Sequence, residues 1–263
     1  MRAATNKISC SPLSRETGTK QQAMKAWVLA ALLLAFAFVL PSMAQAQNGF
    51  VYVNNQSSSN SVAAYKASAT GTLTQITGSP YLTGGVGASE SCYGLSRMAV
   101  SPVNNLLFVA NGGDRTITPF QINATTGALT KTAGAPFASG LTADSCQGLS
   151  LAVTPDGQFL MAASNGQIRT FSVAANGALT FLTSTPNCCS PIMGMSLSPD
   201  GRFLALSNGS SVSMFTVSAG ALTPVVGSPF ARLGTGNLSA LYTQARRHRG
   251  AGALSRRWAG CPQ

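Results

Sequence analysis

From residue 49 onward the chain alternates short apolar runs with turn residues, and no long window repeats its apolar positions at helical spacing. The runs are five to eight residues long, rich in Val, Leu, Phe and Thr, and bounded by Gly, Asn, Asp or Pro. One set reads GLSLAVTP, GQFLMAAS, GQIRTFSV and GALTFLTS within 148–184. Pro-Asp-Gly at 155–157 and 199–201 predicts tight turns, because Pro presets φ and Gly accepts a positive φ. The pattern predicts an all-β fold.

Three phrases recur along the chain in a fixed order. Gly-Thr-Leu-Thr or Gly-Ala-Leu-Thr starts at Gly71, Gly127, Gly177 and Gly220, and a GSP-type phrase begins seven residues after each glycine. The third phrase is SPVNNLLFVAN at 101, TPDGQFLMAASN at 154 and SPDGRFLALSN at 198. Successive copies lie 43–56 residues apart and each holds four short strands. This repeat predicts a β-propeller built of four-stranded antiparallel blades.

We label the strands of a blade A to D, from the channel outward. The first blade is predicted to supply only B, C and D strands, at 50–54, 62–67 and 73–77. Complete sets follow at about 95–133, 149–183 and 194–226, and residues 237–243 are predicted to form one more A strand. The chain therefore holds about four blades.

Several of these phrases resemble a known repeat. They are FVYVNN at 50–55, LLFVANGG at 106–113, the SPDGRFL type of hairpin and the GALT…GSPF outer strand. They resemble the YVTN-type propeller repeat and the seven-bladed lactonase family, whose bacterial members include 6-phosphogluconolactonase-like proteins. The resemblance covers about 50–243. It implies a ring of seven blades, whereas scaffold motifs of this kind specify activity poorly.

Two arrangements fit this count of blades. The strand at 237–243 can complete the first blade and close a four-bladed ring, or the chain can stop a little past halfway round a seven-bladed ring. We favour the truncated ring, because a four-bladed ring needs steeper packing. It would leave apolar faces between blades exposed, which invites pairing or aggregation.

The two ends of the chain differ from its body. Residues 26–40 are an unbroken apolar run, short for a membrane span, with Lys25 before it and a small-x-small cleavage site at 44–46 after it. We predict a signal peptide over 1–46, export to the periplasm or beyond, and a mature start at Gln47; an uncleaved anchor is the alternative. Residues 1–23 look like an over-extended start, since Met24-Lys25 is a more natural one.

The net charge of +11 comes from the ends. Residues 47–231 carry six basic and five acidic side chains, so no basic footprint for nucleic acid exists there. Residues 244–263 contain QARRHRG and SRRW, with no acid and no strand alternation. We interpret this tail as a shifted reading frame; a disordered basic tail and a nucleic-acid or membrane patch are the alternatives. We expect no nucleic-acid partner, and no membrane span after signal cleavage.

Four cysteines lie in the body, and export makes them disulfide candidates. Cys92 and Cys146 occupy the same point of successive blades, two residues before a glycine, and Cys188-Cys189 occupy the corresponding loop of the next blade. A disulfide between adjacent D-to-A loops is the favoured interpretation. A vicinal Cys188–Cys189 pair, a thiolate metal site without CxxC spacing, and free thiols remain open.

In a propeller the D-to-A and B-to-C loops share one face. That face is predicted to collect Glu90, Asp144, Asp114, Arg115, Arg97 and Tyr93. Lactone hydrolysis needs a base to activate water and a donor for the oxyanion. Glu90 or Asp144 is the candidate base, Arg97 or Arg115 the candidate donor, and Tyr93 and Asp114 are candidate binding residues. The competing interpretation is that these are solvated loop charges.

Other chemistry is excluded or left without support. The only histidine, His248, lies in the tail, so a His-based triad or a His metal site in the body is excluded. Asp156 and Asp200 fall in A-to-B hairpins, where turn formation accounts for them. We expect no metal and no other cofactor.

Two classes of function remain, beside the possibility of a broken gene without an active product. One is an exported, non-catalytic propeller that presents its loop face to a small molecule, a glycan or a protein. The other is a lactonase-like hydrolase of a sugar lactone. We favour the first, because charge is sparse, no active-site motif of the family matches, and sugar-phosphate metabolism is cytoplasmic.

Overall fold

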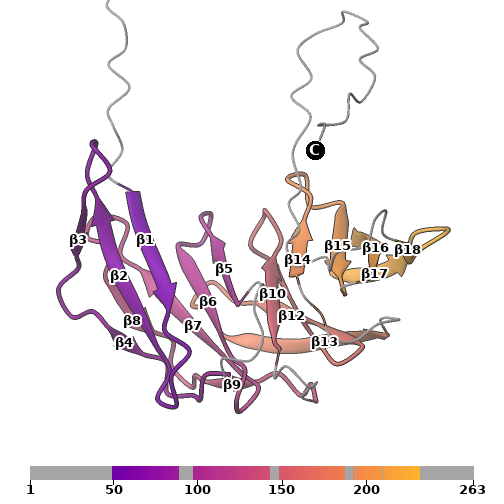
Figure 1. The fold of residues 1–263 in the computed structure, drawn as a ribbon, viewed down its shortest axis with the longest axis horizontal. Helices are drawn as coiled ribbons and strands as arrows, with labels where there is room; N and C mark the ends of the chain where they lie inside the picture. The colour runs from indigo at the N-terminus through magenta and orange to yellow at the C-terminus, as the bar shows by residue number, and fades with distance from the viewer. Residues whose placement is uncertain are drawn as a thin grey trace, which may run out of the picture. The chain divides into compact units, whose positions relative to one another are not determined.

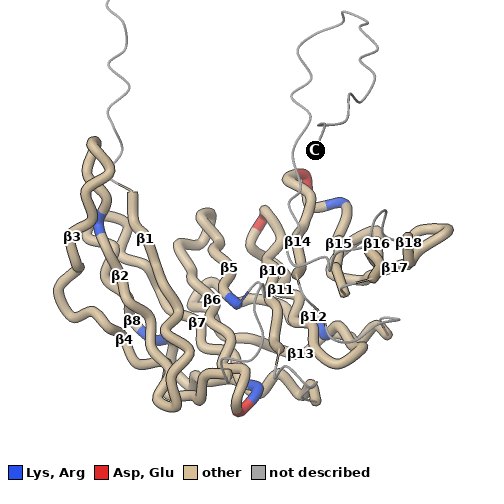
Figure 2. Tube along the Cα trace, in the orientation of Figure 1, with Lys and Arg blue, Asp and Glu red and all other residues tan. Residues whose placement is uncertain are grey.

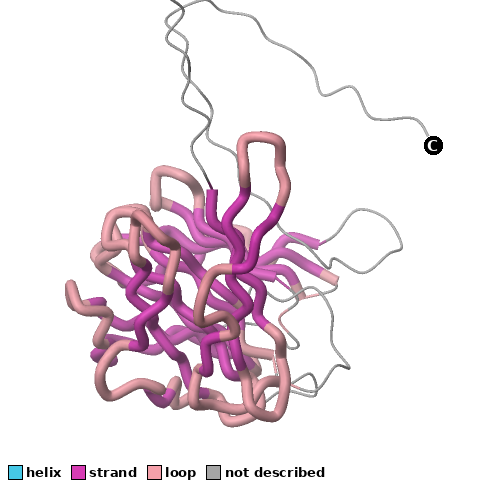
Figure 3. Tube along the Cα trace, turned by 90° about the vertical axis from the view of Figure 1, so that its left-hand side faces the viewer, coloured by secondary structure: helices cyan, strands magenta, loops and turns pink. Residues whose placement is uncertain are grey.

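The computed structural model describes residues 49–88, 97–142, 148–186, 192, 194–208 and 210–231. These residues form strands and turns, and the described part of the chain contains no helix (Figures 1 and 3). Every strand pairing is antiparallel. The all-β prediction is therefore confirmed.

The strands form four separate sheets that follow one another along the chain, and each is one blade. Blade 1 contains β1 (Gly49–Asn54), β2 (Ser61–Ala67), β3 (Leu73–Gln75) and β4 (Tyr81–Leu82). Blade 2 contains β5 (Met98–Ser101), β6 (Leu106–Asn111), β7 (Thr116–Ile122), β8 (Leu129–Lys131) and β9 (Phe137–Ala138). Blade 3 contains β10 (Ser150–Val153), β11 (Phe159–Ser164), β12 (Gln167–Val173) and β13 (Leu179–Pro186). Blade 4 contains β14 (Gly194–Leu197), β15 (Phe203–Ser207), β16 (Ser211–Ser218), β17 (Ala221–Pro224) and β18 (Phe230–Ala231).

The order of strands in the sheets matches the predicted A-to-D scheme. In blades 2, 3 and 4 the sheet order follows the chain, β5-β6-β7-β8, β10-β11-β12-β13 and β14-β15-β16-β17. Blade 1 has the order β1-β2-β3, so among the described residues it consists of B, C and D strands, as predicted. The predicted A strand at 237–243 lies outside the described residues, and the choice between a four-bladed and a seven-bladed ring stays a prediction.

The outermost strand of three blades is split by the GSP-type phrase. Gly78, Gly134 and Gly227 have positive φ and each precedes a cis X-Pro bond, after which β4, β9 or β18 pairs back onto the C strand. In blade 3 the phrase is Ser-Thr-Pro without the glycine, and β13 runs unbroken for eight residues. The D strand predicted at 73–77 corresponds to β3, and the separate strand β4 was not predicted.

Turn chemistry fixes the A-to-B hairpins as the sequence indicates. Asp156 accepts hydrogen bonds from Thr154 Oγ1 at 2.5 Å and from the Gln158 N–H at 3.0 Å. Asp200 does the same with Ser198 Oγ and the Arg202 N–H, at 2.5 and 3.1 Å. The Ser198 hydroxyl, followed by the Arg202 N–H, lowers the pKa of Asp200 from its ordinary value.

The core lies between the blades. Strands β6 and β11 are buried on both faces, and the alternate side chains of each pack on two different neighbouring blades. In β6, Leu106, Phe108 and Ala110 join a cluster with Leu151, Leu160 and Phe171 of blade 3. Leu107 and Val109 point the other way and join Val62 of blade 1. Blades 3 and 4 share a third cluster, which includes Met161, Ile168, Leu204 and Phe215.

The turn glycines of the C-to-D connections sit in these junctions. Gly177 has a φ of +86°, and a Cβ added to it would lie 2.7 Å from Thr132 Oγ1 and 3.0 Å from Leu106 Cδ2 of blade 2. Thr132 Oγ1 also donates to the Asn176 carbonyl at 3.0 Å. At the junction of blades 1 and 2, Tyr52 donates to the Gly127 carbonyl at 2.8 Å. Burial, with a smaller contribution from Tyr81, raises the pKa of Tyr52 to about 12.

We expect Gly177→Ala to lower the free energy of unfolding by about 3 kcal/mol, from backbone strain and overpacking together. Gly71 is the matched control, because it has a φ of +83° but nothing within 4 Å of an added Cβ. Gly71→Ala should therefore show the backbone strain alone, about 1–2 kcal/mol. Urea unfolding measures both losses. Equal losses for the two variants would contradict the close contact at Gly177.

Candidate functional site

The D-to-A and B-to-C loops meet at one end of the blades, which we call the loop end. Its described residues are 55–60, 83–88, 112–115 and 139–142, together with Arg97 and Arg169. They come from blades 1, 2 and 3, and backbone hydrogen bonds join them. Gly113 N donates to the Val86 carbonyl at 3.0 Å, and Gly87 N donates to the Ser57 carbonyl at 2.8 Å.

Buried amides anchor these loops to the strands. Asn60 Nδ2 donates to Asn111 Oδ1 at 2.8 Å, across the junction of blades 1 and 2. Asn111 Nδ2 in turn donates to Thr116 and Thr118, and Thr118 Oγ1 donates to the Thr83 carbonyl at 3.1 Å. Because buried polar groups are costly without partners, this network fixes where the loops start.

Asp114 holds the loop of blade 1 against blade 2. Its Oδ2 accepts from the Val86 N–H at 2.9 Å, and its Oδ1 accepts from the N–H and Oγ1 of Thr116 at 3.2 and 2.8 Å. Both carboxylate oxygens are thus engaged in loop contacts. The sequence predicts Asp114 as a binding residue, but in the described part of the site its hydrogen bonds to the loops are enough to explain its position.

Arg97 and Gln56 form the next contact along the loop end. Arg97 Nη1 donates to Gln56 Oε1, which also accepts from the Ala88 N–H at 3.0 Å. Gln56 has a positive φ of 54°, and its Nε2 is buried without a hydrogen-bond partner among the described residues. The predicted oxyanion donor Arg97 is therefore placed by a glutamine that the sequence does not single out.

Arg115 and Arg169 flank the loop that leaves blade 2. The Ser139 N–H donates to the Arg115 carbonyl at 3.0 Å, and Arg169 Nη1 reaches the Ser139 carbonyl at 3.5 Å. Arg169 also lies over the Phe181 ring, with its Cζ 5.0 Å from the centroid. Its Nε is buried and has no hydrogen-bond partner among the described residues. A Cβ on Gly140 would overlap the guanidinium unless Arg169 moved, and the φ of +64° at this position also favours glycine.

These contacts form a continuous path from Arg97 through Gln56, the 86–88 loop and Asp114 to Arg115, Ser139 and Arg169. The path carries three arginines and one acid, and both oxygens of that acid are already in use. The remaining described acids, Asp156 and Asp200, lie in the A-to-B hairpins. Figure 2 shows that acidic positions are few and lie at opposite edges of the blades. The described loop end can therefore bind an anion through arginine.

Several predicted residues lie outside the described residues. They are Glu90, Tyr93 and Asp144 of the predicted site and Cys92, Cys146, Cys188 and Cys189 of the predicted disulfides. Their roles stay predictions. Within the described ranges, no three His, Cys, Asp or Glu side chains come together as a metal site would require. No helix there is long and apolar enough to span a membrane.

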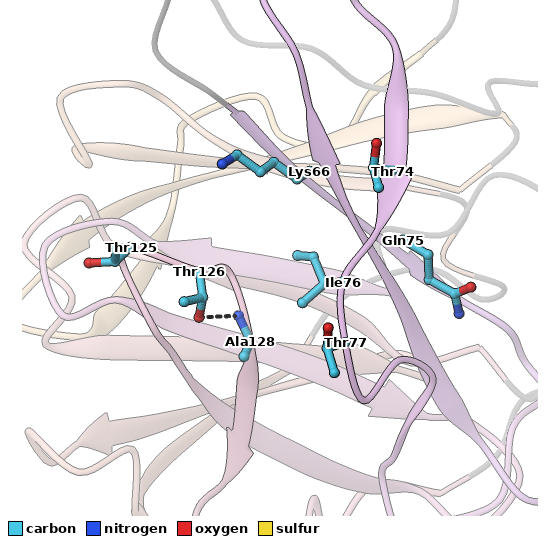
Figure 4. A pocket seen from close by; sticks show the side chains of 8 residues that line it. All are labelled: Lys66, Thr74, Gln75, Ile76, Thr77, Thr125, Thr126 and Ala128. Carbon is cyan, nitrogen blue, oxygen red and sulfur yellow. Dashed lines mark hydrogen bonds between the residues drawn. The ribbon is translucent and has the colours of Figure 1, made fainter.

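Two hollows lie away from the loop end. One, of about 460 Å³, lies between blades 1 and 2 beside the C-to-D turn of blade 2 (Figure 4). Its lining includes Lys66, Ile76 and four threonines, Thr74, Thr77, Thr125 and Thr126. The second, of about 400 Å³, lies between the hairpins of Asp156 and Asp200. The first hollow has no acid in its lining, so it offers no carboxylate base for hydrolysis.

The described blades and loops define a propeller scaffold, and comparison identifies its kind. A family model described as "Lactonase, 7-bladed beta-propeller" matches residues 97–231, about half of the chain. The chain belongs to this lactonase family of seven-bladed β-propellers. The resemblance noted from the repeat phrases is thus confirmed.

Three solved structures are similar to this chain, and the first two support the same fold. A protein from Lactobacillus plantarum is 22% identical with a TM-score of 0.51, and the match covers 69% of this chain and 54% of that one. A functionally unknown protein from Desulfotomaculum acetoxidans is 21% identical, with a TM-score of 0.50 and coverages of 68% and 55%. The periplasmic gluconolactonase of Pseudomonas aeruginosa is 20% identical, with a TM-score of 0.49 and coverages of 67% and 53%. This chain spans about half the length of these structures. No curated protein matches it.

We expect Asp114→Asn to speed hydrogen exchange of the Val86 amide on the order of tenfold, because an amide offers one acceptor where the carboxylate offers two. Mass spectrometry of peptides from 83–88 measures this. Asp156→Asn removes a matching turn carboxylate in blade 3, and it should leave the 83–88 peptides unchanged. Unchanged exchange in Asp114→Asn would contradict the role of Asp114 as a loop anchor.

Proposed function

We propose that this chain is an exported propeller whose loop end binds a hydroxy acid or a sugar phosphate through arginine. The observation that supports this most is Arg169, a guanidinium held against Phe181 with a buried Nε that bonds to no described acceptor. Arginine presents a planar set of donors that matches carboxylate and phosphate oxygens. A bound anion would supply the acceptors that the described residues do not.

The position of Arg169 supports a ligand at the loop end. Its guanidinium contacts the Ser139 carbonyl, and the Ser139 N–H donates to the main-chain carbonyl of Arg115, so the backbone of Arg115 lies at the same loop. Among the described residues, no acid forms an ion pair with Arg115 or Arg169. Membership of the lactonase family supports the hydroxy acid in particular, because opening a lactone ring gives a hydroxy carboxylate.

Family membership also favours a second candidate function, hydrolysis of a sugar lactone. Glu90 or Asp144 would be the base that activates water, and an arginine of the loop end would stabilise the oxyanion. Of the described loop-end residues, the only acid is Asp114, whose oxygens already accept three hydrogen bonds. This is why we place binding first and hydrolysis second. Export is part of the proposal; N-terminal sequencing of the exported chain should find Gln47 first.

We expect the protein to bind gluconate or 6-phosphogluconate and not glucose, which is similar in size and neutral. Arg169→Gln should weaken the binding about tenfold or more, since a charge-assisted bond contributes about 1.5–3 kcal/mol. Arg202→Gln, a charge change on the A-to-B hairpin of blade 4, is the matched control and should bind as the unmodified chain does. Isothermal titration measures all three proteins. Equal binding by Arg169→Gln and the unmodified chain would contradict the proposed site.

Hydrolysis of gluconolactone separates the two candidate functions. A binding protein should hydrolyse the lactone no faster than buffer does, and Glu90→Gln and Asp144→Asn should change nothing. If the chain is a hydrolase, the rate should exceed the uncatalysed one and fall at least 100-fold in one of these variants. A pH-indicator assay measures the rate at which protons are released as the acid forms. Clear hydrolysis that one variant abolishes would overturn the binding-only proposal.

A further inference from the structure

We propose that the open face of blade 1 binds blade 4 of a second copy of this chain, head to tail. Each blade has a front face, which packs on the next blade, and a back face, which packs on the blade before it. The three junctions within the chain all join a front face to a back face. Blade 1 has a back face, but among the described residues no blade covers it.

The back face of blade 1 is apolar and exposed. Val51, Val53, Leu73 and Leu82 are 37, 45, 50 and 61% exposed. Strand register places Ala63, Tyr65 and Ala67 on the same face, opposite Val53, Val51 and Leu73. None of these side chains is charged. Contiguous exposed apolar surface of this kind marks an interaction site.

The repeat shows what normally covers such a face. The positions of Val51, Val53 and Leu73 are held in blade 2 by Leu107, Val109 and Leu129, which are 0, 0 and 6% exposed. These residues are buried in one cluster with Val62 of the front face of blade 1. The natural partner of a back face is therefore the front face of another blade of the same repeat.

The C-to-D turn glycines point to the same conclusion with more detail. A Cβ on Gly127 would overlap the Phe50 ring of blade 1, and a Cβ on Gly220 would lie 2.6 Å from the Phe159 ring of blade 3. At Gly177 the neighbour is Leu106 of blade 2. Phe50, Leu106 and Phe159 hold equivalent positions at the start of their B strands, β1, β6 and β11. Gly71 is the same glycine in blade 1, and nothing lies within 4 Å of its Cβ position.

Blade 4 carries the side chain that would fill this space. Phe203 occupies the B-strand position of Phe50, Leu106 and Phe159. In each blade, the B-strand residue that follows this position pairs with an aromatic residue of the C strand. Val212 on the same front face matches Val62 and Ile168. Phe203, Val212 and Met214 are half-buried, and Ala205 between them is buried. We infer that Phe203 of one copy packs against Gly71 of the other, so Gly71→Ala reports backbone strain alone only where the chain is dilute enough to be a single copy.

An interface of this kind is heterologous, because it joins two different surfaces. Among the described blades, each copy offers one front face and one back face, so two copies can form two junctions and close on each other. Because the interface would repeat the contacts inside the chain, its stability should come from apolar burial and depend little on salt.

The test is the mass of the full chain in solution, measured by light scattering across a range of concentrations. We expect a species of twice the 26.9 kDa chain mass. Leu73→Glu should raise the dissociation constant on the order of 100-fold, because it places an unpaired charge in the interface. Val103→Glu is the control: Val103 is 63% exposed in an A-to-B hairpin, so the dissociation constant should change by about twofold at most.

Mixing variants tests the head-to-tail geometry. Phe203→Glu disrupts the front face of blade 4, and Leu73→Glu disrupts the back face of blade 1. Each variant should therefore be monomeric alone. A mixture of the two variants should form a dimer through the one junction in which both faces are intact. Met214→Lys replaces Phe203→Glu if circular dichroism shows that the latter is unfolded. A monomer at all concentrations, or a dimer that Leu73→Glu leaves unchanged, would overturn the proposal. In those cases residues of the same chain, or another surface, cover the face.

Discussion

The contact that the rest of this structure depends on is the one between a B-strand side chain and the turn glycine of the next blade. Phe50 meets Gly127, Leu106 meets Gly177, and Phe159 meets Gly220. A single four-stranded sheet cannot bury both of its faces, so each blade is stable only when its neighbours cover it. The glycine is needed twice at this point, for its positive φ and for the room that a missing Cβ leaves. This explains why the Gly-x-Leu-Thr phrase is the most regular feature of the sequence.

Because this contact is repeated, the fold could be predicted from sequence in some detail. The B and C strands of blade 1 were expected at 50–54 and 62–67, and β1 and β2 occupy Gly49–Asn54 and Ser61–Ala67. The outer strand was less predictable. A turn at Gly78 divides it in blade 1, whereas blade 3 has no glycine there and keeps one strand. A pattern of apolar positions does not show where a strand turns back to pair with an inner one.

The candidate site could be predicted only in part, since its contacts join residues far apart in sequence. The loop rule places Arg97, Asp114 and Arg115 at one end of the blades, where the structure shows contacts of Asp114 and Arg97 with neighbouring loop residues. What they do there depends on partners the sequence does not indicate. Asp114 bonds to Val86, 28 residues earlier, and Arg97 bonds to Gln56, 41 residues earlier. Arg169 was not predicted, because it lies inside a C strand and only the fold brings it to Ser139, 30 residues before it.

The buried amides at the junction of blades 1 and 2 have hydrogen-bond partners, whereas the buried Nε of Arg169 at the loop end has none among the described residues. This difference distinguishes residues that support the fold from residues that could bind a ligand. Asn60 and Asn111 have their amide groups hydrogen-bonded across the junction of blades 1 and 2, and both residues are fully buried. They hold two blades in register and have no donor left for a ligand. Arg169 is close to the same end, yet its Nε has no acceptor among the described residues, and its Nη1 lies 3.5 Å from the Ser139 carbonyl. A buried donor without a partner costs about 1–3 kcal/mol, and a bound anion would remove that cost. The ligand proposal therefore depends on Arg169 rather than on Asp114, although both are charged residues at the same end of the blades.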